Sequence, residues 1–123
     1  MSYFGFQKLE IYQLAKELVL ENYRNTKTFP ENERYALIQQ MNRAAISIPS
    51  NIYEGYVRDS VKDKCHFLNI AYGSMMELVC QYEISKELEY IDEESFKKFS
   101  NTAYKLAIKI SNFRTYLKGK QQN

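Results

Sequence analysis

The chain has 123 residues and a formal net charge of only +2. This length suits one domain, residues 1–123, which can bury a core without disulfides or metals. The weak net charge argues against a strongly basic nucleic-acid-binding protein, and four Gly and two Pro leave little turn chemistry for an all-β fold.

A first helix is predicted over residues 7–26, because apolar residues recur there at helical spacing. The turn that follows, NTKTFPEN, contains two helix-start signals. Thr28 and Glu31 have the spacing of a capping box, and Pro30 suits a first helical turn. We therefore expect a second helix over residues 31–56.

The second helix has an apolar stripe and an internal proline. The stripe consists of Leu37, Met41, Ala44, Ala45, Ile48 and Ile52. Pro49 cannot donate a backbone hydrogen bond and clashes with the carbonyl of Ala45, at a cost of about 3 kcal/mol in a helix interior. We expect a kink there, with Ser47 or Ser50 satisfying the freed group.

Two further helices are predicted over residues 61–89 and 93–118. Ser60 is a good N-cap for the third helix, and Gly73 in its middle predicts close approach of a neighbouring helix. Asp92 suits the N-cap of the fourth, with Ile91 and Phe96 placed as a hydrophobic staple. The apolar seam of the fourth helix steps by three and four residues through Phe96, Phe99, Ala103, Leu106, Ile110, Phe113 and Leu117. This helix is expected to end near Lys118, with Gly119 as its C′ residue.

Four helices joined by short loops predict an antiparallel, up-down-up-down four-helix bundle. The first residues lack the apolar core of a signal peptide, and no apolar run reaches the ~18 residues of a membrane span. Cys65 and Cys80 fall within helical patterns, which indicates packed, reduced thiols. We expect a cytoplasmic protein with no membrane partner.

A polar ladder follows the apolar stripe of the second helix at steps of three and four: Gln40, Arg43, Ser47, Asn51 and Glu54. Short hydrogen-bonding groups in this pattern indicate a polar packing surface, inside the bundle or between subunits. Arg43 would then pair with Glu54, Glu77 or an acid of a neighbouring copy. A ligand or polynucleotide pocket is the alternative interpretation.

The last part of the chain carries most of the positive charge. Residues 97–123 contain seven cations and no acid, whereas the preceding residues sum to −5. Lys98, Lys105 and Lys109 fall on one helical face. This face is either a solvated surface that pairs with acids of a neighbouring helix or a stripe that contacts phosphates.

Other chemistry has little support in the sequence. The single histidine, His66, and the spacing Asp63-x-x-His66 fall short of a di-iron site, so we expect no metal or cofactor. No nucleophile–base pair is evident, no small-molecule substrate is indicated, and the tyrosines suit a core rim or an interface.

The sequence resembles the 23S rRNA intervening-sequence proteins over nearly its whole length. The resemblance rests on RAAISIPSNIYEG and on two other groups of residues, which are Phe6, Leu9 and Tyr12 near the start and Phe67-Leu68, Ile70-Ala71, Gly73-Ser74 and Glu77-Leu78 later. It implies a bacterial four-helix bundle that assembles as a ring-like homopentamer. A related branch comprises the accessory proteins of diversity-generating retroelements, in which a basic pentamer binds nucleic acid and the reverse transcriptase. This chain departs from that branch in its weak net charge.

The patterns predict a non-enzymatic four-helix bundle that forms a homo-oligomer, and the resemblance implies the pentamer and an RNA- or DNA-associated role. A protein-interaction scaffold that never binds nucleic acid is the alternative. The two hypotheses differ in what the face of Lys98, Lys105 and Lys109 should do.

Overall fold

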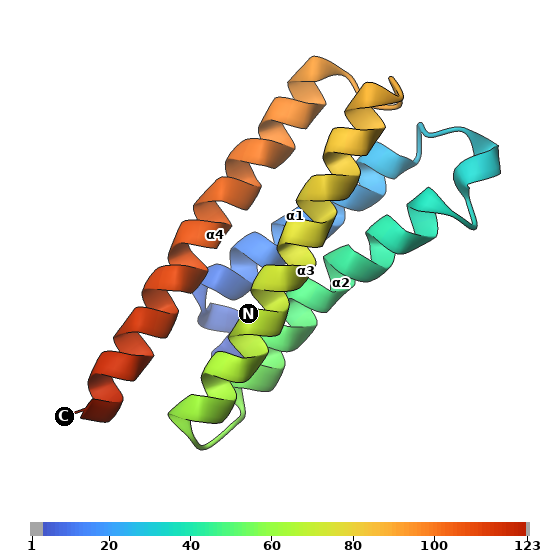
Figure 1. Ribbon diagram of the computed structural model, residues 1–123. Coiled ribbons are helices and arrows are strands. Elements are labelled where there is room, and N and C mark those ends of the chain that lie inside the picture. Colours follow the sequence, from blue (N-terminus) through green and yellow to red (C-terminus); the bar gives the residue numbers. More distant parts are fainter. Residues whose placement is uncertain (1–3, 123) are drawn as a thin grey trace.

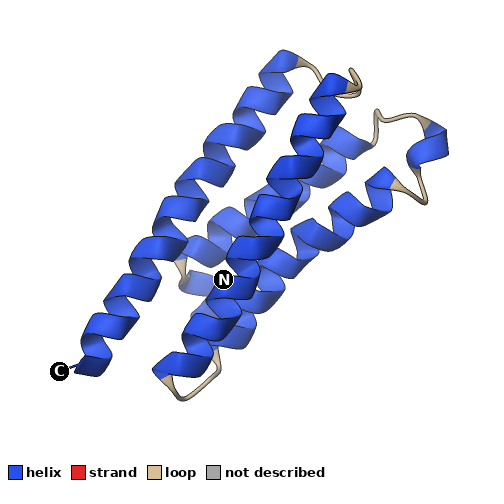
Figure 2. Ribbon diagram, in the orientation of Figure 1, coloured by secondary structure: helices blue, strands red, loops and turns tan. Residues whose placement is uncertain are grey.

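The computed structural model describes residues 4–122, and every regular element among them is a helix (Figure 1). Four α-helices form a bundle with short connections (Figure 2). In chain order the elements are the 3₁₀ turn η1 (Gly5–Lys8), α1 (Glu10–Thr26), the 3₁₀ turn η2 (Glu31–Glu33), α2 (Leu37–Tyr56), α3 (Val61–Glu87) and α4 (Glu93–Gln122). The predicted all-α class is confirmed.

Side-chain contacts fix how the helices pack. Along α2 and α3, Ser47 bonds to Ser74, and the end of α2 at Gly55 meets the start of α3 at Lys64. These two helices therefore run in opposite directions. Between α3 and α4, the rings of Tyr82 and Phe99 stack with centroids 3.5 Å apart.

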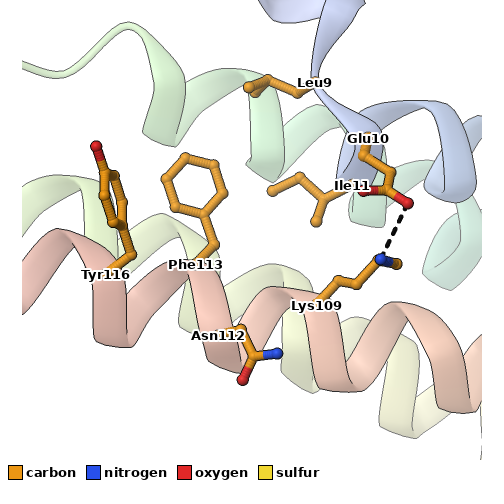
Figure 3. Close-up of a pocket in the computed structure, with 7 residues that line it drawn as sticks. All are labelled: Leu9, Glu10, Ile11, Lys109, Asn112, Phe113 and Tyr116. Carbon is orange, nitrogen blue, oxygen red and sulfur yellow. Dashed lines mark ion pairs between the residues drawn. The ribbon is translucent and has the colours of Figure 1, made fainter.

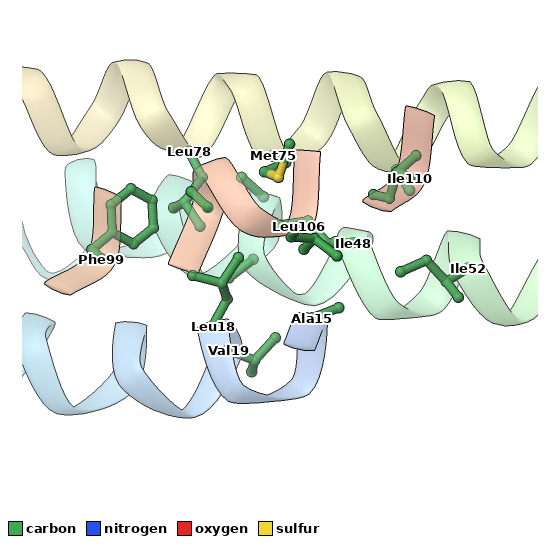
Figure 4. Packing of buried hydrophobic residues seen from close by; sticks show 14 of the residues in the cluster. Ala15, Leu18, Val19, Ile48, Ile52, Met75, Leu78, Phe99, Leu106 and Ile110 are labelled. Carbon is green, nitrogen blue, oxygen red and sulfur yellow. The ribbon is translucent and has the colours of Figure 1, made fainter. Parts of the chain in front are cut away.

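The core lies along the bundle axis and receives residues from all four α-helices (Figure 4). Leu18 of α1, Ile48 of α2, Leu78 of α3 and Leu106 of α4 are fully buried. Each such side chain contributes about 1.5–3 kcal/mol when it leaves water. The helical spacing of the apolar stripes thus predicts the core correctly.

Two predicted helix starts are confirmed by hydrogen bonds. The Ser60 hydroxyl accepts from the Asp63 backbone N–H at 3.1 Å, and the Asp92 carboxylate accepts from the Ser95 N–H at 2.7 Å. The Ser95 backbone bond lowers the pKa of Asp92, because it stabilises the charged form. Side-chain oxygens satisfy N–H groups that a helix start leaves without intrahelical partners.

The other predicted boundaries shift. Leu9 is extended (φ −67°, ψ 131°), so residues 5–8 form a separate turn before α1. Ala36 (φ −122°, ψ −100°) separates η2 from α2. The predicted capping box at Thr28 is wrong, because the Thr28 hydroxyl donates to the Asn25 carbonyl at 3.0 Å at the end of α1. The predicted helix over residues 61–89 ends at Glu87, and Glu89 takes a left-handed conformation with φ 62°.

The predictions for proline and glycine have different outcomes. α2 continues as one helix through Pro49, and the kink expected there stays a prediction. The Ser47 hydroxyl bonds to Ser74 and does not satisfy the freed carbonyl. α4 continues past Gly119, which has no positive φ, because a glycine ends a helix only when it turns left-handed there. A Cβ added to Gly73 would meet no neighbouring atom within 4 Å, so Gly73 permits no close approach between the helices described, and the prediction made for it fails within a single chain. Gly55 does, because a Cβ there would lie 3.0 Å from the Lys64 carbonyl oxygen.

Candidate assembly and nucleic-acid surfaces

The middle of the polar ladder lies in the seam between α2 and α3. The hydroxyls of Ser47 and Ser74 are 2.8 Å apart, and the Asn51 amide donates to the Ser47 carbonyl at 2.8 Å and to its hydroxyl at 2.9 Å. All three side chains are half-buried. This part of the ladder is closed within one chain, so its polar groups need no partner copy.

The ends of the ladder behave differently. Glu54 pairs with Arg58 at 2.6 Å, and the Arg58 guanidinium also covers the Phe67 ring at 4.6 Å. Glu54 is therefore not the partner of Arg43. The side chains of Arg43 and Gln40 are exposed, and neither forms a hydrogen bond or ion pair with the residues that the structure describes. Among these residues, the Arg43 guanidinium therefore has no partner.

A second seam runs along the solvent side of α3. Its members step by three and four residues, the spacing with which helices interdigitate in bundles. All are exposed: Ile70, Gly73, Glu77, Cys80 and Ile84. This seam points away from the core of its own chain. It therefore has the spacing of a helix–helix contact but faces solvent in the single chain.

The predicted lysine face of α4 lies beside α1. Lys109 forms an ion pair with Glu10 at 3.0 Å, and the charge of Lys98 acts on Glu21. Lys105 is exposed and has no ion pair among the residues that the structure describes. The acids Glu10, Glu17 and Glu21 share the face of α1 that turns to α4, so an intramolecular partner takes up part of this positive charge.

An open cleft borders the same face where α4 runs past the start of α1 (Figure 3). It measures about 430 Å³ and is lined mainly by Leu9, Ile11, Phe113 and Tyr116, with the pair of Lys109 and Glu10 at its edge. Its lining residues include no nucleophile with a neighbouring base, so its geometry gives no sign of catalysis.

Comparison with known proteins gives the family. Residues 7–112 match the family described as "23S rRNA-intervening sequence protein". The chain belongs to this family. No curated protein matches it.

A solved structure similar to this intervening-sequence protein has a TM-score of 0.78 and 21% sequence identity. It covers 85% of this chain and 95% of its own, and is described as a protein with unknown function from the S23 ribosomal protein family of Bacteroides thetaiotaomicron VPI-5482. At this identity the likeness shows the fold alone. The family and this neighbour therefore support the helical bundle and assign no activity.

Sequence reasoning missed a buried polar cluster in this family member. The Tyr82 hydroxyl donates to Asn22 at 3.0 Å and accepts from Asn25 at 3.0 Å, and the Asn22 amide donates to Asn42 at 2.8 Å. Burial raises the pKa of the Tyr82 phenol, and the hydrogen bond from Asn25 opposes this. The available signal was Asn22, which continues the apolar stripe of α1 four residues after Leu18.

Glu21 lies beside this cluster with only 3% of its surface exposed. Neither of its carboxylate oxygens has a hydrogen-bond partner among the described residues. Burial raises the pKa of Glu21, and the Lys98 charge lowers it by less. The Glu21 carboxyl thus has the positive charge of Lys98 near it but no hydrogen bond from the described residues.

Metal ligands do not gather in the part of the chain between residues 4 and 122. No group of three His, Cys, Asp or Glu side chains there is placed to hold an ion. Cys65 is buried, whereas Cys80 and His66 are exposed. None of the helices described is long and apolar enough to cross a membrane.

Proposed function

We propose that this protein is a non-enzymatic assembly module whose copies associate through α2 and α3. The observation that carries the proposal is the exposed seam of α3, which repeats the spacing of a bundle contact on the solvent side. An exposed Gly in mid-helix costs about 1 kcal/mol relative to Ala. Gly73 makes no close approach to the other helices that the structure describes, and close approach of a neighbouring copy would account for it.

The polar residues beside this seam fit the same contact. The Arg43 side chain has no ion-pair partner among the residues that the structure describes, and Glu77 stands in the middle of the seam. An ion pair between Arg43 of one copy and Glu77 of the next would combine opposite charges, and such complementarity fixes the register of an interface. Gln40 lies on the same side of α2 and would complete its hydrogen bonds there.

The family resemblance supports the finer parts of this proposal. They are an up-down-up-down topology, a ring-like homopentamer, a cytoplasmic location and kinship with the accessory proteins of diversity-generating retroelements. A repeated head-to-tail contact between different faces closes into a ring, as a pentamer requires. In the alternative role, as a protein-interaction scaffold, the ring would bind other proteins and no nucleic acid.

The test of assembly is a substitution on the seam. Ile84→Glu places a charge at an exposed position, where the fold of a single chain tolerates it and an apolar contact does not. We expect native mass spectrometry to show dissociation into folded monomers. Met76→Glu is the matched control, because Met76 is similarly exposed on α3 but lines the groove toward α4. An oligomer that survives Ile84→Glu would overturn the proposed face.

Association with nucleic acid is the second candidate. Lys98 and Lys105 are exposed and form no ion pair with the residues described, and repetition around a ring would multiply their effect. The family description, which concerns 23S rRNA-intervening sequences, supports RNA as the polyanion. Binding through phosphates should weaken steeply with salt, and the double variant Lys98→Glu, Lys105→Glu should remove part of that salt dependence.

A further inference from the structure

We infer that the groove between α1 and α2 binds a single-stranded polynucleotide by stacking its bases on tyrosine. This inference rests on the nucleic-acid candidate above and goes beyond it, because it names a second surface, which would contact the bases. The groove measures about 750 Å³ and opens on the opposite side of α1 from that face. Tyr23 of α1, Arg34 and Tyr35 of the turn before α2, and Arg43 of α2 line it.

Both tyrosine rings of this groove are exposed. Tyr35 is 80% exposed and Tyr23 is 42% exposed. The Arg34 guanidinium lies 5.6 Å from the centre of the Tyr35 ring. A guanidinium beside an exposed ring offers one planar group for stacking and one cation for a phosphate, and this combination suits unpaired nucleotides.

Charge on the same side supports a polyanion. Lys16 and Lys27 stand seven residues before and four residues after Tyr23, so they share its face of α1. Both are exposed, and neither forms an ion pair with the residues described. From Arg34 to Tyr53 the sequence contains no Asp or Glu. The acids of α1 turn to α4 instead. At one end of the groove, Glu31 pairs with Arg34 at 3.2 Å, and the half-buried Glu33 accepts from the Tyr90 hydroxyl at 2.8 Å.

Hydrogen-bonding groups on the groove wall can meet base edges. Asn42 uses its carbonyl oxygen to accept from the buried Asn22, which leaves the Asn42 NH₂ group as a donor. Gln39 is exposed beside it. Arg43 lies where the groove meets the proposed assembly face, so the test avoids it.

The experiment measures fluorescence anisotropy of labelled oligouridylate of about 12 nucleotides, within the site sizes of single-strand binders. Oligothymidylate and a duplex of the same length are parallel probes. Tyr23→Ala and Tyr35→Ala should each weaken binding by about 5- to 100-fold without changing its salt dependence, because stacking releases no counterions. Tyr35→Phe should restore the affinity. Tyr104→Ala is the matched control, a 71% exposed tyrosine on α4, and should bind as the wild type.

The outcomes separate this inference from the candidate on which it rests. Wild-type binding that is unchanged by both tyrosine variants overturns the groove and leaves nucleic-acid association standing. Equal affinity for the duplex overturns stacking, since paired bases are not available. No wild-type binding to any probe at low salt refutes nucleic-acid association and the groove together. A preference for oligouridylate over oligothymidylate supports the groove with RNA as its ligand, and the reverse preference supports it with DNA.

Discussion

Replacing Gly by Ala should change the free energy of unfolding in opposite directions at the two glycines inside α2 and α3. Replacing Gly by Ala in a helix interior favours folding by about 1 kcal/mol. At Gly73 the new Cβ meets nothing within 4 Å, so Gly73→Ala should gain most of this amount. At Gly55 the Cβ would lie 3.0 Å from the Lys64 carbonyl oxygen and 3.4 Å from the Phe67 Cβ. Overpacking of that kind costs about 1–3 kcal/mol, so Gly55→Ala should lose about 1 kcal/mol net.

The assay is urea unfolding followed by circular dichroism, in the Ile84→Glu background so that association does not contribute. The two variants should differ by about 2 kcal/mol in the free energy of unfolding, with equal m-values. A Gly55→Ala variant more stable than its parent would refute the close approach of α2 to α3. A Gly73→Ala variant less stable than its parent would refute the claim that a Cβ at Gly73 meets no neighbouring atom among the described residues.

Three further predictions concern single side chains. Tyr82→Phe should cost about 1–2 kcal/mol in urea unfolding, because Asn22 loses its buried donor; an unchanged midpoint would contradict the cluster. Glu89→Gly should gain about 0.5–1 kcal/mol by relieving the left-handed backbone, whereas Glu89→Ala should not, and equal gains would point to charge instead. Glu21→Gln should raise the free energy of unfolding at neutral pH. The pKa of Glu21 in the folded protein lies above the usual 4.5, so the wild type loses stability as pH rises through that pKa. The stability gained by Glu21→Gln over the wild type should therefore fade as pH drops toward 4.5. A gain that does not depend on pH would contradict this.

The sequence predicts most of the fold because apolar spacing and capping residues are local signals. Ser60 and Asp92 show this, since each cap depends only on residues three positions away. Leu9 and Ala36 could not be predicted in this way, because each is an ordinary helix former that breaks the helix pattern. Glu89 likewise adopts a left-handed conformation that its residue type disfavours.

The candidate surfaces were only partly predictable. Helical spacing places Ser47 and Asn51 in one seam, but it cannot show that Ser74 closes that seam from α3. The lysines of α4 were evident from the sequence, whereas their partner Glu10 depends on how α1 packs. The groove of Tyr23 and Tyr35 was missed because it joins residues of a helix and a loop that share no periodicity.

Native mass spectrometry of the purified wild-type protein tests the central claim, assembly through α2 and α3, most directly. The account predicts a homo-oligomer, a pentamer under the full proposal, that Ile84→Glu converts to folded monomers and Met76→Glu leaves intact. A wild-type protein that remains monomeric at every concentration tested would contradict the account.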